Sequence, residues 1–206
     1  PIMIGSHIDS VIGGGNYDGQ VGSMGAIEVV KNINENNIQL RHPIEVVIFS
    51  NEEGGKTGSR AMANLVEDFE LNIVTDSGHT IGEGLSLNGG DPNKLEDASR
   101  DSNSIAGYLE LHIEQGEVLD RKKIDIGIVE GIVGIKRWNV LVKGKTNHAG
   151  TTPMHNRSDS LVAASSFIQN VYSIAKTIVG THVATVGRIK ANPGAPNVIP
   201  GETTLS

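Results

Sequence analysis

The stretch Pro1-Ile2-Met3-Ile4-Gly5-Ser6-His7-Ile8-Asp9-Ser10 decides how the rest of the chain is interpreted. Residues 1–8 are mostly apolar and predict a buried strand that ends in a polar loop. His7 and Asp9 are two residues apart at the strand end, so their side chains point the same way. A metal-binding imidazole needs its other ring N–H held by a carboxylate or a carbonyl, and Asp9 is positioned to hold that of His7.

Three further segments offer oxygen or nitrogen ligands. Asp18 lies beside a glycine in a loop, where its two oxygens could bridge two cations. Glu52 and Glu53 are adjacent and diverge in direction, so one could ligate a metal while the other takes a proton from metal-activated water. His112 would supply a second imidazole. Ligands of this kind, without sulfur, favour Zn²⁺, with Mn²⁺, Co²⁺ or Ni²⁺ as alternatives. We therefore predict a two-metal hydrolytic site.

The first part of the chain has the pattern of an α/β layer. A strand at 1–8, a helix from about Gly22 and a strand at 44–49 follow one another, which favours a mainly parallel sheet. Residues 55–70 are predicted to be helical. Residues 75–104 are rich in Gly, Asp, Asn and Ser, and predict an irregular connection that could hold one short helix.

Apolar and polar residues alternate over 108–114, which predicts a strand with His112 on its polar face. The pattern of apolar and polar residues changes after the segment 127–134, which contains several glycines and is a plausible hinge. Beyond it, a strand at 138–143, a helix capped by Ser158, and two strands form a βαββ pattern. These last two strands are expected near residues 182–190 and 198–205. We accordingly predict one domain at 1–133 and another at 134–206.

Composition excludes several classes of function. The net charge of −7 argues against nucleic acids and anionic membranes as partners. The absence of cysteine excludes disulfides and thiolate ligands and suits a reducing compartment, so we expect a cytoplasmic protein. We find no apolar run of about 18 residues, so no membrane span is expected. Both ends fall in strand-like runs, and we expect the chain to be part of a longer one.

One alternative deserves comparison with the metal site. The strand at 44–50, followed by Gly55-Lys56-Thr57 and a predicted helix, imitates a phosphate-binding loop. However, Ser50 stands where the first glycine belongs, and two glutamates inside the loop would repel a triphosphate. Each candidate metal segment is, taken alone, an ordinary polar loop. The metal site is favoured because every segment lies at or beside a predicted strand end, where α/β sites form.

Six short motifs span almost the whole chain. They are GSHIDSV at 5–11, GGNYDG at 14–19, SNEEG at 50–54, ELHIEQG at 110–116, NHAGTTPM at 147–154 and NVIPG at 197–201. In this order they resemble the M20-type amidohydrolases, and most closely the hydantoinase/carbamoylase branch. That branch contains N-carbamoyl-L-amino-acid hydrolases, allantoate amidohydrolases and β-ureidopropionases. The resemblance implies part of an aminopeptidase-like α/β catalytic domain, followed by part of an α+β ferredoxin-like lid that also dimerises.

The resemblance also implies roles for individual residues. Two divalent ions are implied, one held by His7, bridging Asp18 and His112, the other by Asp18 and Glu53. Further roles are implied outside this ligand set. Glu52 resembles the general base, and Gln115 and Asn197 resemble substrate-binding positions. His148 resembles the lid histidine that stabilises the tetrahedral intermediate, often across a homodimer.

The implied activity is hydrolysis of a linear C–N bond, in an N-carbamoyl amino acid or an allantoate-like ureido acid, by metal-activated water. The family's last metal-ligand histidine and its substrate-carboxylate arginine would both fall beyond Ser206. The loop at 54–58 is also shorter than the family's. These departures leave an alternative, in which the chain is a catalytically incompetent fragment or relative that binds metal weakly or only dimerises.

Overall fold

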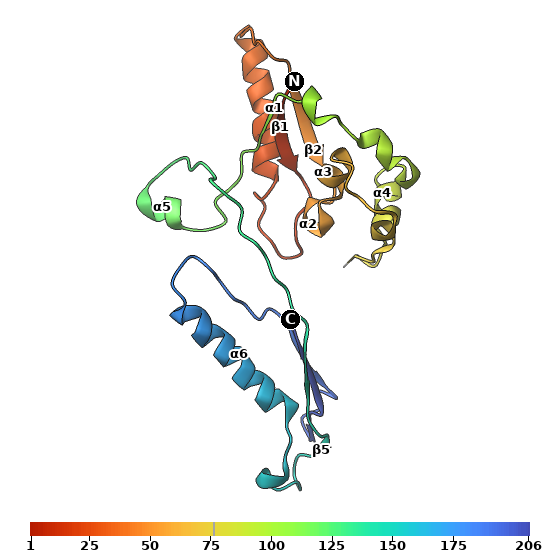
Figure 1. The fold of residues 1–206 in the computed structure, drawn as a ribbon, viewed down its shortest axis with the longest axis vertical. Helices are drawn as coiled ribbons and strands as arrows, with labels where there is room; N and C mark the ends of the chain where they lie inside the picture. Colours follow the sequence, from red (N-terminus) through yellow and green to blue (C-terminus); the bar gives the residue numbers. More distant parts are fainter. Residues whose placement is uncertain (76) are drawn as a thin grey trace. The chain divides into compact units, whose positions relative to one another are not determined.

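The computed structural model describes residues 1–75 and 77–206. These divide into two compact units, Pro1–Ile128 and Val129–Ser206, which are described separately (Figure 1). The division falls close to the boundary predicted between residues 133 and 134. Within the described ranges, no helix is both long and apolar enough to cross a membrane.

The first unit is built on a parallel three-stranded sheet in the order β2-β1-β3. The central strand β1 (Ile2–His7) is flanked by β2 (Ile44–Phe49) and by β3 (Gly107–Leu109), and both neighbours run parallel to it. From Met3 to His7 every residue of β1 is buried, as expected of a central strand covered on both faces. The predicted parallel sheet is confirmed.

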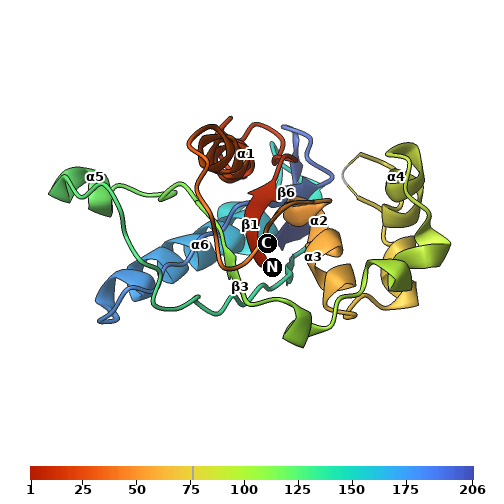
Figure 2. The same ribbon diagram turned by 90° about the horizontal axis from the view of Figure 1, so that it is seen from above.

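Helix α1 (Gln20–Glu35) connects β1 to β2 and packs against both strands, and Figure 2 shows it end-on beside β1. The helix is where the sequence predicts it, but its buried face consists of the small residues Gly22, Ser23 and Ala26. The large apolar side chain of Met24 in this helix is instead 62% exposed. Gly22 explains why this face is the buried one, because the helix lies so close to the sheet here that a Cβ at position 22 would lie 2.6 Å from Cβ of Ser6. The helix therefore approaches the sheet through its smallest side chains.

The helix predicted at 55–70 is interrupted. The structure has α2 (Glu52–Gly55), α3 (Thr57–Met62) and a 3₁₀ helix at Asp68–Asn72. Lys56, between the first two helices, has a left-handed backbone with φ of 59°, which ends one helix and starts the next at a new angle. The periodicity of apolar residues did not reveal this break.

The connection predicted at 75–104 contains more helix than expected. One of its residues, Asp76, lies outside the described residues. It holds α4 (Ile81–Leu87) and 3₁₀ helices at Pro92–Ala98 and Ser102–Ser104. The strand predicted at 108–114 is wrong beyond Leu109, because no strand is assigned to residues 110–114. Alternation indicates which side chains share a face, but a strand also needs a neighbour for its backbone groups. A short helix, α5 (Val118–Lys122), follows.

The second unit is an antiparallel sheet with one helix packed on it. Its strands lie in the order β4-β8-β6, formed by Val140–Lys143, Glu202–Leu205 and Ile189–Asn192. Helix α6 (Ser160–Thr177) packs against β4 and β8. Two fully buried residues, Ala164 of the helix and Thr203 of β8, lie in this core.

Three boundaries in this unit differ from the predictions. Asp159, not Ser158, caps α6, and its carboxylate accepts from the backbone N–H of Leu161 at 2.9 Å. The strand predicted at 182–190 begins only at Ile189. The strand predicted at 198–205 is divided in two, because the chain turns at Pro200-Gly201 between β7 (Val198–Ile199) and β8. Strand β7 pairs instead with β5 (Asn147–His148).

Candidate metal centre

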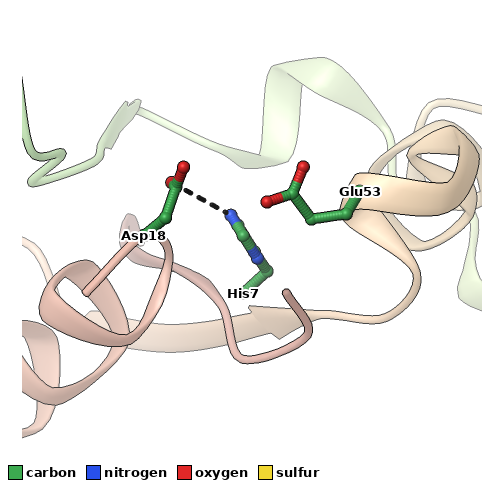
Figure 3. Close-up of side chains that lie close together, drawn as sticks. All are labelled: His7, Asp18 and Glu53. Carbon is green, nitrogen blue, oxygen red and sulfur yellow. Dashed lines mark ion pairs between the residues drawn. The ribbon is translucent and has the colours of Figure 1, made fainter. Parts of the chain in front are cut away.

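Three predicted ligands converge in the first unit. His7 is the last residue of β1, Asp18 lies in the loop before α1, and Glu53 belongs to α2. One ligand atom from each lies within 4.8 Å of the other two, and Figure 3 shows the three side chains pointing toward one another. The loops that follow parallel strands leave the sheet at the same edge, which is why distant segments meet here.

The imidazole of His7 is buried and its orientation is set by the backbone. Its Nδ1 lies 2.9 Å from the carbonyl oxygen of Asp9. A carbonyl can only accept a hydrogen bond, so Nδ1 carries a proton and Nε2 is the nitrogen left to face other groups. That Nε2 lies 3.8 Å from Oδ1 of Asp18 and 3.7 Å from Oε2 of Glu52. Nε2 is therefore directed at carboxylate oxygens.

His112 approaches the same carboxylate with the same tautomer. Its Nδ1 lies 2.7 Å from the carbonyl oxygen of Ile113, and its Nε2 lies 3.2 Å from Oδ1 of Asp18. Two acceptor nitrogens directed at an acceptor oxygen repel one another unless a proton or a metal ion lies between them. Two ligands of one tetrahedral ion, each about 2.1 Å from it, are about 3.4 Å apart. The two separations from Oδ1 of Asp18 lie on either side of that value. Among the described residues, the ligand atoms that all lie within 4.8 Å of one another belong to His7, Asp18 and Glu53, and His112 approaches this group through Asp18.

Asp9 links the strand end to the acidic helix. Its Oδ2 accepts from the backbone N–H of Glu53 at 3.0 Å, and its Oδ1 lies 3.5 Å from Nδ1 of His7. That Oδ1 atom is buried and has no hydrogen-bond partner among the described residues. The residue before the acidic pair, Asn51, has a left-handed backbone with φ of 52°. Asp9 thus links Glu53 to the end of β1, and its backbone carbonyl, rather than its carboxylate, is bonded to Nδ1 of His7.

Two predicted acidic side chains each have one carboxylate oxygen that already accepts a hydrogen bond. Oε1 of Glu52 accepts from Nζ of Lys56, and Oδ2 of Asp18 accepts from the side-chain amide of Gln115. Gln115 has a left-handed backbone with φ of 53°, a conformation that is costly for a residue other than glycine. Oδ1 of Asp18 is the oxygen that lies near both imidazoles, and the amide of Gln115 takes one lone pair of Oδ2.

Gly19 leaves room for the imidazole of His7. Its φ is +79°, and a Cβ built at this position would lie 2.4 Å from Nδ1 and Cε1 of the ring. The backbone of the Asp18 loop therefore lies directly against His7. Only glycine allows both this conformation and this approach.

His148 and Asn197 lie in the second unit, His148 at the end of β5 and Asn197 directly before β7, with which β5 pairs. The backbone N–H of Gly150 donates to Nδ1 of His148 at 3.0 Å, so the neutral ring carries its proton on Nε2. The backbone N–H of Ala149 donates to the carbonyl of Asn197 at 3.0 Å. The two predicted residues thus come from adjoining segments of one unit, and His148 presents an N–H donor.

The sequence interpretation missed a network around Glu110. Its carboxylate accepts from the hydroxyl of Ser6, which is 1% exposed, and from that of Tyr108 at 3.0 Å. Burial raises the pKa of Tyr108 well above its usual range, and the carboxylates of Glu110 and Glu52 raise it further, so the phenol stays a donor. Ser23, also buried, donates to the carbonyl of His7 at 2.8 Å. The alternation over 108–114 placed Glu110 on the face of His112, and this was the available signal.

Comparison with known proteins agrees with this geometry. The model of peptidase family M20/M25/M40 matches residues 3–195, so the chain belongs to that family, whose enzymes are metal-dependent. The chain is 41% identical over 211 residues to an N-carbamoyl-L-amino-acid amidohydrolase of Paenarthrobacter aurescens, covering 100% of this chain and 51% of that protein. It is 36% identical over 232 residues to an allantoate deiminase of Arabidopsis thaliana, covering 100% and 44%.

A solved structure gives the same result. The amidase of the hydantoinase/carbamoylase family from Burkholderia vietnamiensis superposes with a TM-score of 0.76 at 33% identity, over 100% of this chain and 50% of that one. Within the M20 family, the chain is therefore a member of the hydantoinase/carbamoylase branch, as its motifs indicated. The chain spans about half the length of the curated relatives it matches.

Proposed function

We propose that the protein containing this chain hydrolyses a linear C–N bond in an N-carbamoyl amino acid or an allantoate-like ureido acid. The observation that carries the proposal is the approach of His7 and His112, from distant segments, to one oxygen of Asp18. Each imidazole directs an Nε2 lone pair at that oxygen, an arrangement that suits a divalent ion. The names of the relatives supply the substrate class.

The residues present would hold two divalent ions. His7, Asp18 and His112 would bind one, and Asp18 and Glu53 would bind the other. Zn²⁺ fits the nitrogen and oxygen ligands best, with Mn²⁺, Co²⁺ or Ni²⁺ as alternatives. When bound, such ions polarise a carbonyl group and lower the pKa of the attacking water.

The remaining side chains would carry the proton and the substrate. Glu52, whose Oε2 lies 3.7 Å from Nε2 of His7, would accept a proton from the attacking water and deliver it to the leaving nitrogen. His148 would donate its Nε2 proton to the oxyanion that develops on the carbonyl. Gln115 and Asn197 would bind the substrate. The three antiparallel strands and one helix of the second unit support a ferredoxin-like lid, through which the protein would form a homodimer.

The proposal is tested with the protein that contains this chain, stripped of metal by chelation and then reloaded with Zn²⁺ or Mn²⁺. N-carbamoyl-L-amino acids and allantoate are supplied, and release of amino acid and ammonia is measured. Metal-dependent turnover of at least one of these is expected. Absence of turnover with every ion and both substrate classes would contradict the proposal.

The 206-residue chain alone provides a second measurement. If it binds ions weakly and does not turn over while the longer protein does, the chain by itself is the incompetent fragment that the sequence left as an alternative. The measurement on the 206-residue chain is informative because the chain covers only about half the length of its relatives.

A further inference from the structure

Strand β3 stops before it reaches the site. Its pairing with β1 joins Ile2 with Gly107, Met3 with Tyr108 and Ile4 with Leu109, and no strand is assigned beyond Leu109. If this register continued, His7 would stand opposite His112. The two imidazoles nevertheless meet at Asp18, although the strand pairing ends three residues before each of them. Something other than the strand pairing must therefore hold residues 110–112 in register with β1.

Beyond the last paired residues, side-chain hydrogen bonds connect the segment after β3 to β1. Glu110 follows directly after β3, and its carboxylate accepts from the hydroxyl of Ser6, the neighbour of His7. Ser6 is 1% exposed and belongs to the central strand, so it is a rigid anchor. The hydroxyl of Tyr108 lies 3.0 Å both from the other carboxylate oxygen of Glu110 and from the carbonyl of Gly5, so its single proton is shared between them or donated to one. Glu110 is thus tied to β1 directly through Ser6, and its other oxygen lies beside Tyr108 of the neighbouring strand β3.

We infer that Glu110 is a positioning residue, which sets His112 against Asp18 by tying the segment after β3 to Ser6 and Tyr108. This inference rests on the proposed function, because it takes His112 as a metal ligand. Glu110 itself does not contact Asp18 or any other predicted ligand in the hydrogen bonds and ion pairs of the described residues. We therefore assign its effect on metal binding to the placement of His112, two residues further along the chain.

A double-mutant cycle tests this with Co²⁺ as the probe, in the protein that contains this chain. Co²⁺ affinity is measured by calorimetry, and the ligand set by the visible absorption of the bound ion, in wild type, Glu110→Ala, His112→Ala and the double variant. Loss of a supporting partner of a metal-bound histidine costs about 10- to 100-fold in affinity. We expect that loss for Glu110→Ala in wild type, a changed cobalt spectrum, and a loss of less than about twofold in the His112→Ala background.

Glu110→Gln is the conservative control, because the amide oxygen can still accept from Ser6, and it should recover part of the affinity. If Glu110→Ala does not fold, Tyr108→Phe carries the same cycle, since it removes one donor to Glu110 and keeps the ring. Equal losses in the two backgrounds would show a general structural effect and overturn the inference, as would no loss in wild type. If the wild-type protein itself does not bind Co²⁺, the proposed function fails first, which separates the two failures.

Discussion

Nε2 of His112 lies 3.2 Å from Oδ1 of Asp18, although the two residues follow different elements of the first unit. Both His112 and His7 direct Nε2 at this oxygen, so Asp18 is the centre of the candidate site. Replacing Asp18 removes the one group that both predicted ions would share.

Asp18→Ala is therefore expected to weaken Zn²⁺ binding by at least about 100-fold, more than the loss of a mere supporting residue. Calorimetric titration of the metal-free protein measures this. Asp120→Ala is the matched control, because Asp120 is an exposed aspartate paired only with Lys123 among the described ion pairs, and it should leave binding unchanged. Similar affinities for the two variants would remove Asp18 from the ligand set.

Glu52 is close enough to His7 to be either a base or a ligand. If it is the base, Glu52→Gln should lower kcat by about 10²- to 10⁴-fold while the bound metal content stays the same. Steady-state kinetics and elemental analysis of the same sample give the two numbers. A variant that loses its metal together with its turnover would make Glu52 a ligand, and one that keeps its turnover would leave it without a catalytic role.

Gly19→Ala should disturb the site, and Gly13→Ala provides a close comparison. Both glycines have left-handed backbones, with φ of +79° and +73°, so either substitution costs about 1–2 kcal/mol of stability. Only at position 19 would the new Cβ meet the ring of His7; at position 13 nothing lies within 4 Å. Urea unfolding should show both losses of stability, whereas Zn²⁺ titration should show weakened binding for Gly19→Ala alone. Equal metal affinities would mean that His7 moves aside without consequence.

The pair Arg60–Glu70 predicts how stability responds to acid. Arg60 donates to both oxygens of Glu70, and this, with the backbone N–H of Glu67, lowers the pKa of Glu70 below its usual value. A carboxylate whose pKa is lower in the folded state than in the unfolded state stabilises the fold at pH values above the unfolded-state pKa. This stabilisation is lost as the pH falls through the folded-state pKa. Arg60→Gln should therefore be less stable than wild type at pH 7, with the gap closing below about pH 4. Urea unfolding at both pH values measures this, and a gap that is independent of pH would exclude the pair as its cause.

The order of the elements and most of the candidate site could be predicted from the residues themselves. The apolar run at 1–8 predicts the central strand, because burial on both faces leaves no polar alternation. Helix α1 and strand β2 follow for similar reasons of periodicity. The residue types of His7, Asp18, Glu53 and His112 predict metal ligation, because each lies at or beside a strand end, where imidazole and carboxylate groups can converge.

Only the tertiary structure decided where strand β3 ends, which face of α1 is buried, and that Glu110 joins Ser6 and Tyr108. Period-two and helical patterns are local properties of a few side chains. Whether a backbone finds a partner, or a glycine lets a helix approach, depends on segments far away in the chain. The direction of each Nε2 lone pair was likewise decided by folding, because it follows from which carbonyl each Nδ1 reaches.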